Sequence, residues 1–311
     1  MSKLFRVLLM AAALGVPQTS ALAWHDTGHM VVAQIAYLRL SPSARAHVER
    51  LLAQPEGNRR PLVFYCDKTY DPVTIAVWMD DIKGDSLADE YSPWHYTNFR
   101  PIFDGIPERT NVAAEPVNVV DRLNWSISTL SKGTGRAKSD AEILGFIYHL
   151  VGDVHQPLHA ATRYSAKNPD GDAGGNGFAV QMPPETRIRN LHSYWDSAAG
   201  LFGYESPRRP LDEAGRARLR TYADDLMRRF PADANQNWKN VEPHDWAVES
   251  NHLARTFAYA KIRDGEAPSK AYADEAQRLS AERITLAGYR LAEVLNRVFP
   301  NPPAPPTPAR R

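Results

Sequence analysis

The sequence is short of cysteine and of long apolar runs. Cys66 is the only cysteine among the 311 residues, so no disulfide can form within the chain. It lies in the apolar run 63–66, where a buried small hydrophobic side chain is a better interpretation than a nucleophile. The apolar run near the N-terminus, residues 7–16, is shorter than the roughly 20 residues that a membrane-spanning helix needs.

An excess of charge of one sign is also missing. Lys and Arg together number 37 and Asp and Glu 36, which gives a formal net charge of +1. Nothing in this balance resembles the basic surface of a protein that binds nucleic acid through its own charge. If a polyanion is the substrate, a bound metal cluster must therefore supply much of the local positive field.

The first residues have the pattern of a secretory signal, which we assign to residues 1–23. A basic start precedes the apolar run, and residues 21–23, Ala-Leu-Ala, form an A-x-A cleavage site. We expect cleavage after Ala23, so that Trp24 becomes the first residue of a periplasmic or secreted protein. Residues 24–299 contain no internal repeat or low-complexity linker, which favours one domain. The proline-rich residues 300–311 are expected to form a flexible tail.

Helical periodicity dominates the chain after the signal, so we expect an all-α fold with at most a small β-hairpin. Ser41-Pro42 is typical of an N-cap followed by a first-turn proline. The expected helices cover residues 28–38, 44–52, 117–130, 139–154, 211–230, 243–260 and 270–298. Strand signal is sparse, and residues 178–182, after a glycine cluster, are the best candidate for one arm of a hairpin.

Two histidine–aspartate pairs have helical spacing. His149 and Asp153, like His192 and Asp196, lie four residues apart, which brings both side chains to one helix face within reach of a single ion. Either pair alone could equally be a hydrogen bond on a solvated face. Aromatic and apolar neighbours surround both pairs, so the polar groups are expected to be buried and to need partners, which a divalent ion would supply.

Further candidate ligands lie close to these pairs or beside tryptophans. His159 follows Pro157, which should end the first helix and let this imidazole turn toward a different ion. Asp80 and His95 each lie beside a tryptophan that could exclude water. Histidine and aspartate without thiolate suit a zinc ion with an open coordination position better than a closed structural site.

The order and spacing of these motifs resemble the three-zinc single-strand nucleases of fungi, plants and bacteria, the mould S-one/P-one nuclease type. The motifs that carry the resemblance are Trp24…Gly28-His29, Trp78-x-Asp80, Trp94-His95-Tyr96, His149-x-x-x-Asp153 with Gln156-Pro157-Leu158-His159, Gly174-Gly175-Asn176, Asn190-Leu191-His192-x-x-Trp195-Asp196 and Trp246-x-x-Glu249-Ser250. The resemblance covers most of the chain after residue 23 and implies a mainly helical scaffold, similar to zinc phospholipase C.

The resemblance implies three zinc ions per chain. The implied ligands are Asp80, His95, His149 and Asp153 for the first ion, His159, His192 and Asp196 for the second, and the amino nitrogen and carbonyl oxygen of Trp24 with His29 and a bridging Asp153 for the third. An α-amine coordinates only when it is free and deprotonated, so the signal before Trp24 would have to be removed before the third site can close.

The resemblance also implies a function. Zinc lowers the pKa of a bound water toward about 7 and so supplies hydroxide for attack on phosphorus. The implied enzyme is a monomeric endonuclease that cleaves single-stranded DNA and RNA to 5′-phosphorylated products, with removal of a 3′-phosphate left open. Asp80 is expected to orient the attacking water. Lys83 is expected to contact phosphate, with a solvated helix lysine as the alternative.

Base recognition is expected to be loose. Tyr96 stands where the family often has phenylalanine, and its ring can stack on any base. Asn98 stands where a carboxylate can contact the base edge, and this departure leaves the base preference open. Asn176 could donate its amide to a base, or could serve only in a glycine-rich turn.

Two other functions compete with the nuclease. A bacterial zinc phospholipase C would use a similar scaffold and ligand set on phospholipid head groups, but the motif at residues 190–196 and the Gly-Gly-Asn turn favour the nuclease. A non-catalytic metal-binding protein is the other alternative, which a complete set of ligands for open zinc sites disfavours.

Overall fold

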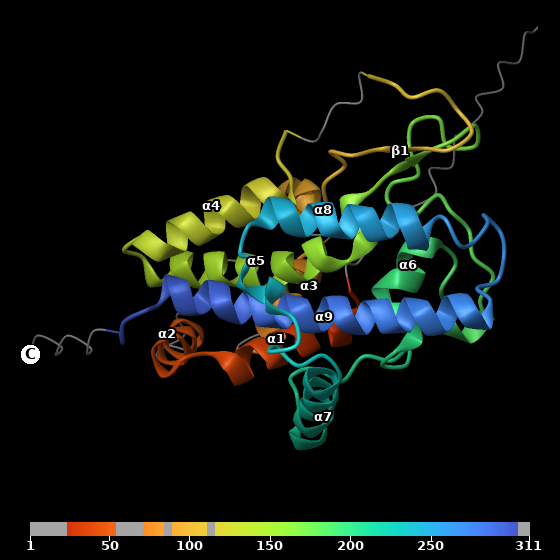
Figure 1. Cartoon of the computed structure of the whole chain (residues 1–311). Coiled ribbons are helices and arrows are strands. Elements are labelled where there is room, and N and C mark those ends of the chain that lie inside the picture. Colours follow the sequence, from red (N-terminus) through yellow and green to blue (C-terminus); the bar gives the residue numbers. More distant parts are fainter. Residues whose placement is uncertain (1–23, 54–70, 84–88, 111–115, 304–311) are drawn as a thin grey trace, which may run out of the picture.

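The computed structural model describes residues 24–53, 71–83, 89–110 and 116–303. The expected signal at 1–23, the expected burial of Cys66 and most of the proline-rich tail fall outside these residues. Figure 1 shows helices stacked in layers, with α4 and α8 on one side of α5 and α9 and α1 on the other. The described residues contain no helix with the length and apolar character needed to cross a membrane.

The fold is mainly helical, as the periodicity predicts. The α-helices are α1 (Asp26–Arg39), α2 (Pro42–Leu52), α3 (Trp78–Asp81), α4 (Val119–Lys132), α5 (Ala137–His155), α6 (Leu191–Asp196), α7 (Glu213–Arg229), α8 (Pro243–Leu253) and α9 (Lys270–Val298). Strand structure within the described ranges is one parallel pair, β1 (Ile102–Phe103) with β2 (Arg163–Tyr164).

Helix α5 forms the centre of the molecule. It packs against α1, α4, α8 and α9, and the residues from Leu144 to Val154 are apolar on most sides of the helix. A helix that is apolar nearly all round must be surrounded by other elements. The polar exceptions between Leu144 and Val154, His149 and Asp153, are fully buried.

Local sequence signals account for the ends of several helices. The Ser41 side chain accepts a hydrogen bond from Ala44 N, with Pro42 in the first turn of α2, as predicted. Helix α5 ends at His155 because Pro157 cannot continue it, and a short 3-10 turn, Pro157–Ala160, follows. Helix α6 begins at the N-cap Asn190, whose side chain accepts from Ser193 N at 2.8 Å.

Two details of the sequence prediction were wrong. Residues 178–182 do not form a strand of a hairpin: Ala179 makes one isolated antiparallel bridge to Asn190, and Gln181 N donates to Glu266 O instead of continuing a ladder. The expected helix 243–260 is interrupted, because α8 ends at Leu253 and continues as a π-helical turn, Ala254–Ala258. Apolar periodicity cannot distinguish an extended loop that hydrogen-bonds to other segments from a strand.

Candidate metal centre

The predicted ligands come from different parts of the chain and meet around the C-terminal half of α5. Three groups of buried histidines and aspartates could hold a metal ion within the described residues. They are His29 with Asp80 and His149, His95 with His149 and Asp153, and His159 with His192 and Asp196. Eight of the nine predicted ligand residues are thus brought together in side-chain groups, and the ninth, Trp24, was predicted to bind through its main chain.

The Asp153 carboxylate lies at the centre of the first cluster. Its Oδ2 is 2.9 Å from His95 Nδ1 and 3.3 Å from His149 Nε2, and its Oδ1 is 3.3 Å from His29 Nε2. His149 Nε2 and His95 Nδ1 also face each other at 3.1 Å. The spacing of four residues on α5 therefore brings His149 and Asp153 together, and Asp153 reaches two more imidazoles.

His29 fits into this cluster only because its neighbour on α5 is a glycine. Its ring stacks on that of His149 with centroids 4.1 Å apart. A β-carbon at Gly152 would lie 2.6 Å from His29 Nδ1, far inside van der Waals contact. Neither ring nitrogen of His29 has a hydrogen-bond partner among the described residues. A buried imidazole in this state is suited to a metal ion.

Asp80 and Lys83 lie at the more accessible edge of the cluster. Asp80 Oδ1 is 3.6 Å from His149 Nε2 and forms an ion pair with Lys83 Nζ. The Lys83 side chain is 16% exposed, whereas that of Asp80 is 4% exposed. Lys83 is therefore held against a buried carboxylate.

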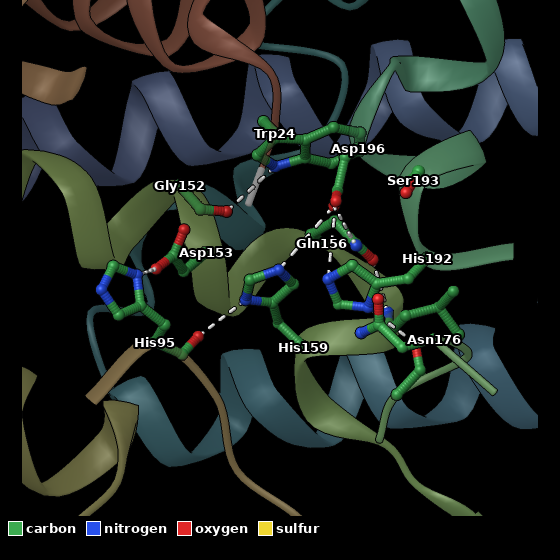
Figure 2. A network of polar contacts seen from close by, with 12 residues as sticks. Trp24, His95, Gly152, Asp153, Gln156, His159, Asn176, His192, Ser193 and Asp196 are labelled. Atoms are coloured by element: carbon green, nitrogen blue, oxygen red, sulfur yellow. Dashed lines mark hydrogen bonds and ion pairs between the residues drawn. The ribbon is translucent and has the colours of Figure 1, made fainter. Parts of the chain in front are cut away.

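The second cluster forms where the end of α5 meets α6. Asp196 Oδ2 is 3.5 Å from His192 Nε2, and Asp196 Oδ1 is 3.8 Å from His159 Nε2. The centroids of the two imidazole rings are 4.9 Å apart. Neither Nε2 atom has a hydrogen-bond partner within the part of the chain that the structure describes. Figure 2 shows both rings and the Asp196 carboxylate converging on one point.

Backbone carbonyls orient three of these imidazoles. The Nδ1 atoms of His149, His159 and His192 each lie 2.7 Å from a carbonyl oxygen, of Ala76, His95 and Gly174 respectively. Donation from Nδ1 fixes the tautomer and leaves Nε2 as the lone-pair nitrogen, the usual outer support of a metal-binding histidine.

The glycine-rich turn supports His192. Gly174 has φ of +66°, and a β-carbon there would lie 2.6 Å from Leu158 O. The carbonyl of this same glycine accepts from His192 Nδ1. The turn thus needs glycine for its left-handed backbone, and its carbonyl positions an imidazole.

Burial keeps most of these imidazoles neutral. It lowers the pKa of His29, His159 and His192, and together with Lys83 it lowers the pKa of His95 to about 3. Only in His149 do nearby carboxylates, Asp153 and Asp80, outweigh burial and raise the pKa. A neutral imidazole is the form that binds a metal ion.

The carboxylates differ from one another. Burial would raise the pKa of Asp80 and Asp153, but Lys83 and the neighbouring histidines outweigh it at Asp80, and the histidines alone outweigh it at Asp153, so that both pKa values are lowered. Burial raises the pKa of Asp196 to about 6, since the groups around it compensate less. Buried carboxylates among neutral imidazoles need positive charge, and divalent cations fit this set of donors.

Trp24 lies between the two clusters. Its fully buried indole donates through Nε1 to Gly152 O at 3.0 Å, next to Asp153, and His25 N donates to Asp196 O at 2.8 Å. Figure 2 shows the Trp24 side chain above Gly152 and near Asp196. A β-carbon at Gly28 would lie 2.8 Å from Trp24 Cβ, so the glycine lets α1 pack closely against this residue.

The predicted base-contacting residues lie near the clusters. Tyr96, one residue after His95, is half-buried, and its carbonyl accepts from Val119 N at 3.1 Å. Asn98 accepts a hydrogen bond from Thr162 Oγ1 at 2.6 Å. Asn176 Nδ2 donates to Ala173 O at 2.8 Å, which gives its amide a role within the turn.

Comparison with known proteins decides the family. The model of the family described as S1/P1 Nuclease matches residues 24–300. The chain belongs to the S1/P1 nuclease family. It is 28% identical to Endonuclease 2 of Arabidopsis thaliana over 293 residues, which cover 89% of this chain and 90% of that protein. Its identity to Nuclease S1 of Aspergillus oryzae is 26% over 318 residues, covering 94% and 98%.

A further relative is Nuclease P1 of Penicillium citrinum, 26% identical over 181 residues that cover 56% of this chain and 57% of that protein. The family match begins at Trp24, the residue predicted to follow the signal. Membership in a nuclease family makes this protein an enzyme with nucleic acid as its class of substrate, which confirms the resemblance in the motifs.

One supporting residue of this nuclease was not predicted as part of the site. Gln156 Nε2 donates to Asp196 Oδ1 at 2.7 Å, and its Oε1 accepts from Leu158 N at 2.5 Å (Figure 2). It lies within a quoted motif, but contact with a residue 40 positions away leaves no mark in local spacing. Gln156 thus joins the end of α5 to the aspartate of α6.

The nuclease should be sensitive to replacement of Gln156. Gln156→Leu removes the amide that orients Asp196, and we expect metal affinity at the second cluster to fall by about 10–100-fold, the usual effect of removing an outer support. Titration of the metal-depleted protein with zinc measures this. Gln277→Leu is the control, because it removes a similar bond, to Ala199 O at 2.9 Å, on α9. Equal zinc affinity in Gln156→Leu and the native protein would contradict the assignment.

Whether the His29 ring needs the space left by Gly152 can be tested by a substitution. Gly152→Ala is expected to displace the His29 ring and lower nuclease kcat/KM by roughly 10–100-fold, since small misplacements of reacting groups are costly. Gly288→Ala is a matched control, because its β-carbon would meet Ile35 Cβ at the same 2.6 Å but in the α1–α9 interface. Gly288→Ala is expected to lower stability and to leave the zinc content unchanged.

Proposed function

We propose that this nuclease is a periplasmic or secreted zinc enzyme that begins at Trp24 and cleaves single-stranded DNA and RNA internally to 5′-phosphorylated products. The observation that carries the proposal is the set of three buried histidine–aspartate groups, whose inward nitrogens His29 Nε2, His159 Nε2 and His192 Nε2 lack hydrogen-bond partners among the described residues. The family match and the motif order support it.

The proposed ligand sets follow the family pattern. A first zinc is assigned to Asp80, His95, His149 and Asp153, a second to His159, His192 and Asp196, and a third to His29, Asp153 and the main-chain nitrogen and oxygen of Trp24. Support for the shared role of Asp153 comes from its contacts with His29, His95 and His149 through both carboxylate oxygens.

The side chains around these positions would divide the work of hydrolysis. Zinc, when bound, supplies positive charge and lowers the pKa of water toward about 7. Asp80 would orient the attacking water, a role supported by its carboxylate, which is the most accessible of the three and has a lowered pKa. Lys83 beside it would contact the phosphate and offset the negative charge that grows on the phosphoryl oxygens in the transition state.

Single-strand preference follows from how bases are recognised. A base can stack on the Tyr96 ring only when it has left its own stack, which costs least in a single strand. We assign contact with the edge of the base to Asn98 and to Asn176 at the glycine turn. The Asn98 side-chain oxygen accepts a hydrogen bond from Thr162 Oγ1, which holds the amide in place. Asparagine can both donate and accept, so no strict base preference is expected.

A single panel of substrates tests the proposal. The mature protein is incubated with single-stranded DNA, RNA, duplex DNA, a 3′-nucleoside monophosphate and lecithin, each with and without chelator. The expected result is chelator-sensitive cleavage of DNA and RNA single strands with 5′-phosphate ends, and much slower cleavage of duplex. Lecithin cleavage without cleavage of nucleic acid would instead assign the site to a phospholipase C.

The role of Trp24 as first residue gives a separate prediction. One additional alanine before Trp24 turns the Trp24 nitrogen into a peptide amide and so removes the free α-amine that the proposed third site uses. We expect the third zinc to bind at least about 10-fold more weakly, as for other losses of metal-site geometry, with a matching loss of activity. An additional alanine after Arg311 is the control. Full zinc content and full activity in the N-terminal variant would refute the assignment.

A further inference from the structure

A strip of aromatic rings and one arginine covers part of α4 and the segment before His95. We call Tyr91, Trp94, Arg122 and Trp125 the α4 strip. The rings of Tyr91 and Trp94 have centroids 4.5 Å apart. The guanidinium carbon of Arg122 lies 4.8 Å from the Trp94 ring centroid and 5.7 Å from that of Trp125. The strip is thus a continuous series of flat groups in contact with one another.

The outer end of the strip is exposed. Trp125 is 42% exposed and is one of only two large hydrophobic side chains that the described residues expose, the other being Tyr204. Trp94 and Tyr91 are half-buried and lead inward from it. An exposed indole in contact with a guanidinium suits a ligand that offers a flat face and negative charge.

The strip adjoins the metal centre. Trp94 directly precedes His95. Its ring packs against that of Phe146 on α5, with ring centroids 5.1 Å apart, and Phe146 lies three residues before His149. Val119 N, in the first turn of α4, donates to Tyr96 O at 3.1 Å. The inner end of the strip is therefore tied to the segment that carries a proposed ligand and a proposed base-stacking residue.

Arg122 carries a charge that the described residues do not neutralise. No described carboxylate lies within 4.0 Å of its guanidinium, and its Nε has no hydrogen-bond partner among the described residues. By contrast, Arg283 and Arg290 are both held by Glu249 at 2.6–2.7 Å. The nearest acid in sequence, Asp121, accepts from Asn118 Nδ2 at 2.7 Å. The two indole rings hold the guanidinium in place while its charge remains for phosphate.

We infer that the α4 strip binds the part of a single-stranded nucleic acid that extends beyond the cleaved nucleotide, with a base on Trp125 and a backbone phosphate at Arg122. The inference rests on the proposed nuclease function and extends its substrate-binding surface. Aromatic stacking accepts every base, which matches an enzyme without strict sequence preference. The near-neutral surface of the chain makes an anchoring cation outside the metal centre valuable for long strands.

The test compares long and short substrates on the zinc-loaded enzyme. Trp125→Ala is expected to raise KM for a thymidylate dodecamer by about 5- to 50-fold, the effect of losing one stacked base, with kcat unchanged. KM for the thymidylate dinucleotide, which cannot reach the strip, is expected to stay within about twofold of the native value. Trp125→Phe should restore most of the dodecamer affinity. Arg228→Ala, an exposed arginine on α7, is the control.

Binding provides a readout apart from activity. For a fluorescent phosphorothioate dodecamer, the dissociation constant should rise in Trp125→Ala by the same factor as KM. Arg122→Ala should reduce the slope of log affinity against log salt by about 0.7, the value for one phosphate contact on a single strand. Arg122→Lys should keep the slope but lose affinity, because lysine retains the charge without the flat stacking face.

The outcomes separate the inference from the proposed function. Unchanged dodecamer affinity in Trp125→Ala, or an equal loss for dodecamer and dinucleotide, would overturn the inference even if the native enzyme is an active nuclease. A native enzyme that cleaves no nucleic acid would refute the proposed function, and the phosphorothioate assay would still decide the role of the strip. Binding of the native protein to anionic vesicles, lost in Trp125→Ala while dodecamer binding is kept, would assign the strip to a lipid surface and overturn the inference.

Discussion

Replacement of Asp153 by asparagine is expected to lower nuclease kcat/KM by at least about 10³-fold, since it removes charge stabilisation at the centre of the site. Asp153 is fully buried and is the one described carboxylate within 3.3 Å of three imidazoles. An amide removes the negative charge that two zinc ions would share and turns an N–H donor toward imidazole nitrogens. We therefore expect the zinc content to fall below three ions per chain. Steady-state kinetics and elemental analysis measure the two effects.

The control for this variant is Asp224→Asn on α7, where the carboxylate is 49% exposed and pairs with Arg220. A surface change of this kind should alter stability by less than about 0.5 kcal/mol and leave activity unchanged. If Asp153→Asn kept three zinc ions and near-native activity, Asp153 would not be a bridging ligand. Loss of activity without loss of zinc would instead limit its role to the chemistry.

Chelation is expected to remove activity completely and to lower the melting temperature by roughly 10 °C or more, given about 4 kcal/mol for a ligand at a thousand times its dissociation constant. Without zinc, Asp196 stays buried among imidazoles that burial keeps neutral, and the inward Nε2 atoms of His29, His159 and His192 lack hydrogen-bond partners among the described residues, an arrangement that costs free energy of folding. No disulfide can compensate, because Cys66 is the only cysteine. Differential scanning calorimetry of holo and chelated protein checks the prediction.

Two controls show whether the shift belongs to the metal centre. His252→Ala, an exposed histidine on α8, should keep the full shift on chelation, whereas His192→Ala should melt lower before chelation and show a smaller further shift. Zinc added back should restore both activity and melting temperature, and magnesium should not, because magnesium prefers oxygen ligands. A melting temperature that chelation leaves unchanged would refute the stabilising role of zinc.

The sequence alone predicts the parts of this fold that depend on local signals. The Ser41 N-cap, the end of α5 before Pro157 and the full extent of α9, Lys270–Val298, follow from capping residues, proline and periodicity. The 178–182 segment could not be assigned correctly, because its hydrogen bonds go to Arg189 and Glu266 rather than to a neighbouring strand. Long-range backbone pairing leaves no signal in such a short run.

The candidate site divides in the same way. Spacing on one helix predicts that His149 and Asp153 meet, and the structure brings them to 3.3 Å. Nothing in the local pattern says that His29, more than 100 residues earlier, stacks on His149, and the family resemblance predicted only that His29 lies beside Asp153. The contact of Gln156 with Asp196 was missed because it depends on how α5 and α6 dock.

The central claim is that the mature chain binds three zinc ions, one of them through its own first residue. Anomalous diffraction at the zinc edge from crystals of the protein beginning at Trp24 tests this most directly. Three peaks are expected: one among Asp80, His95, His149 and Asp153, one among His159, His192 and Asp196, and one between Trp24, His29 and Asp153. Two peaks with none beside Trp24, or peaks away from these groups, would contradict it.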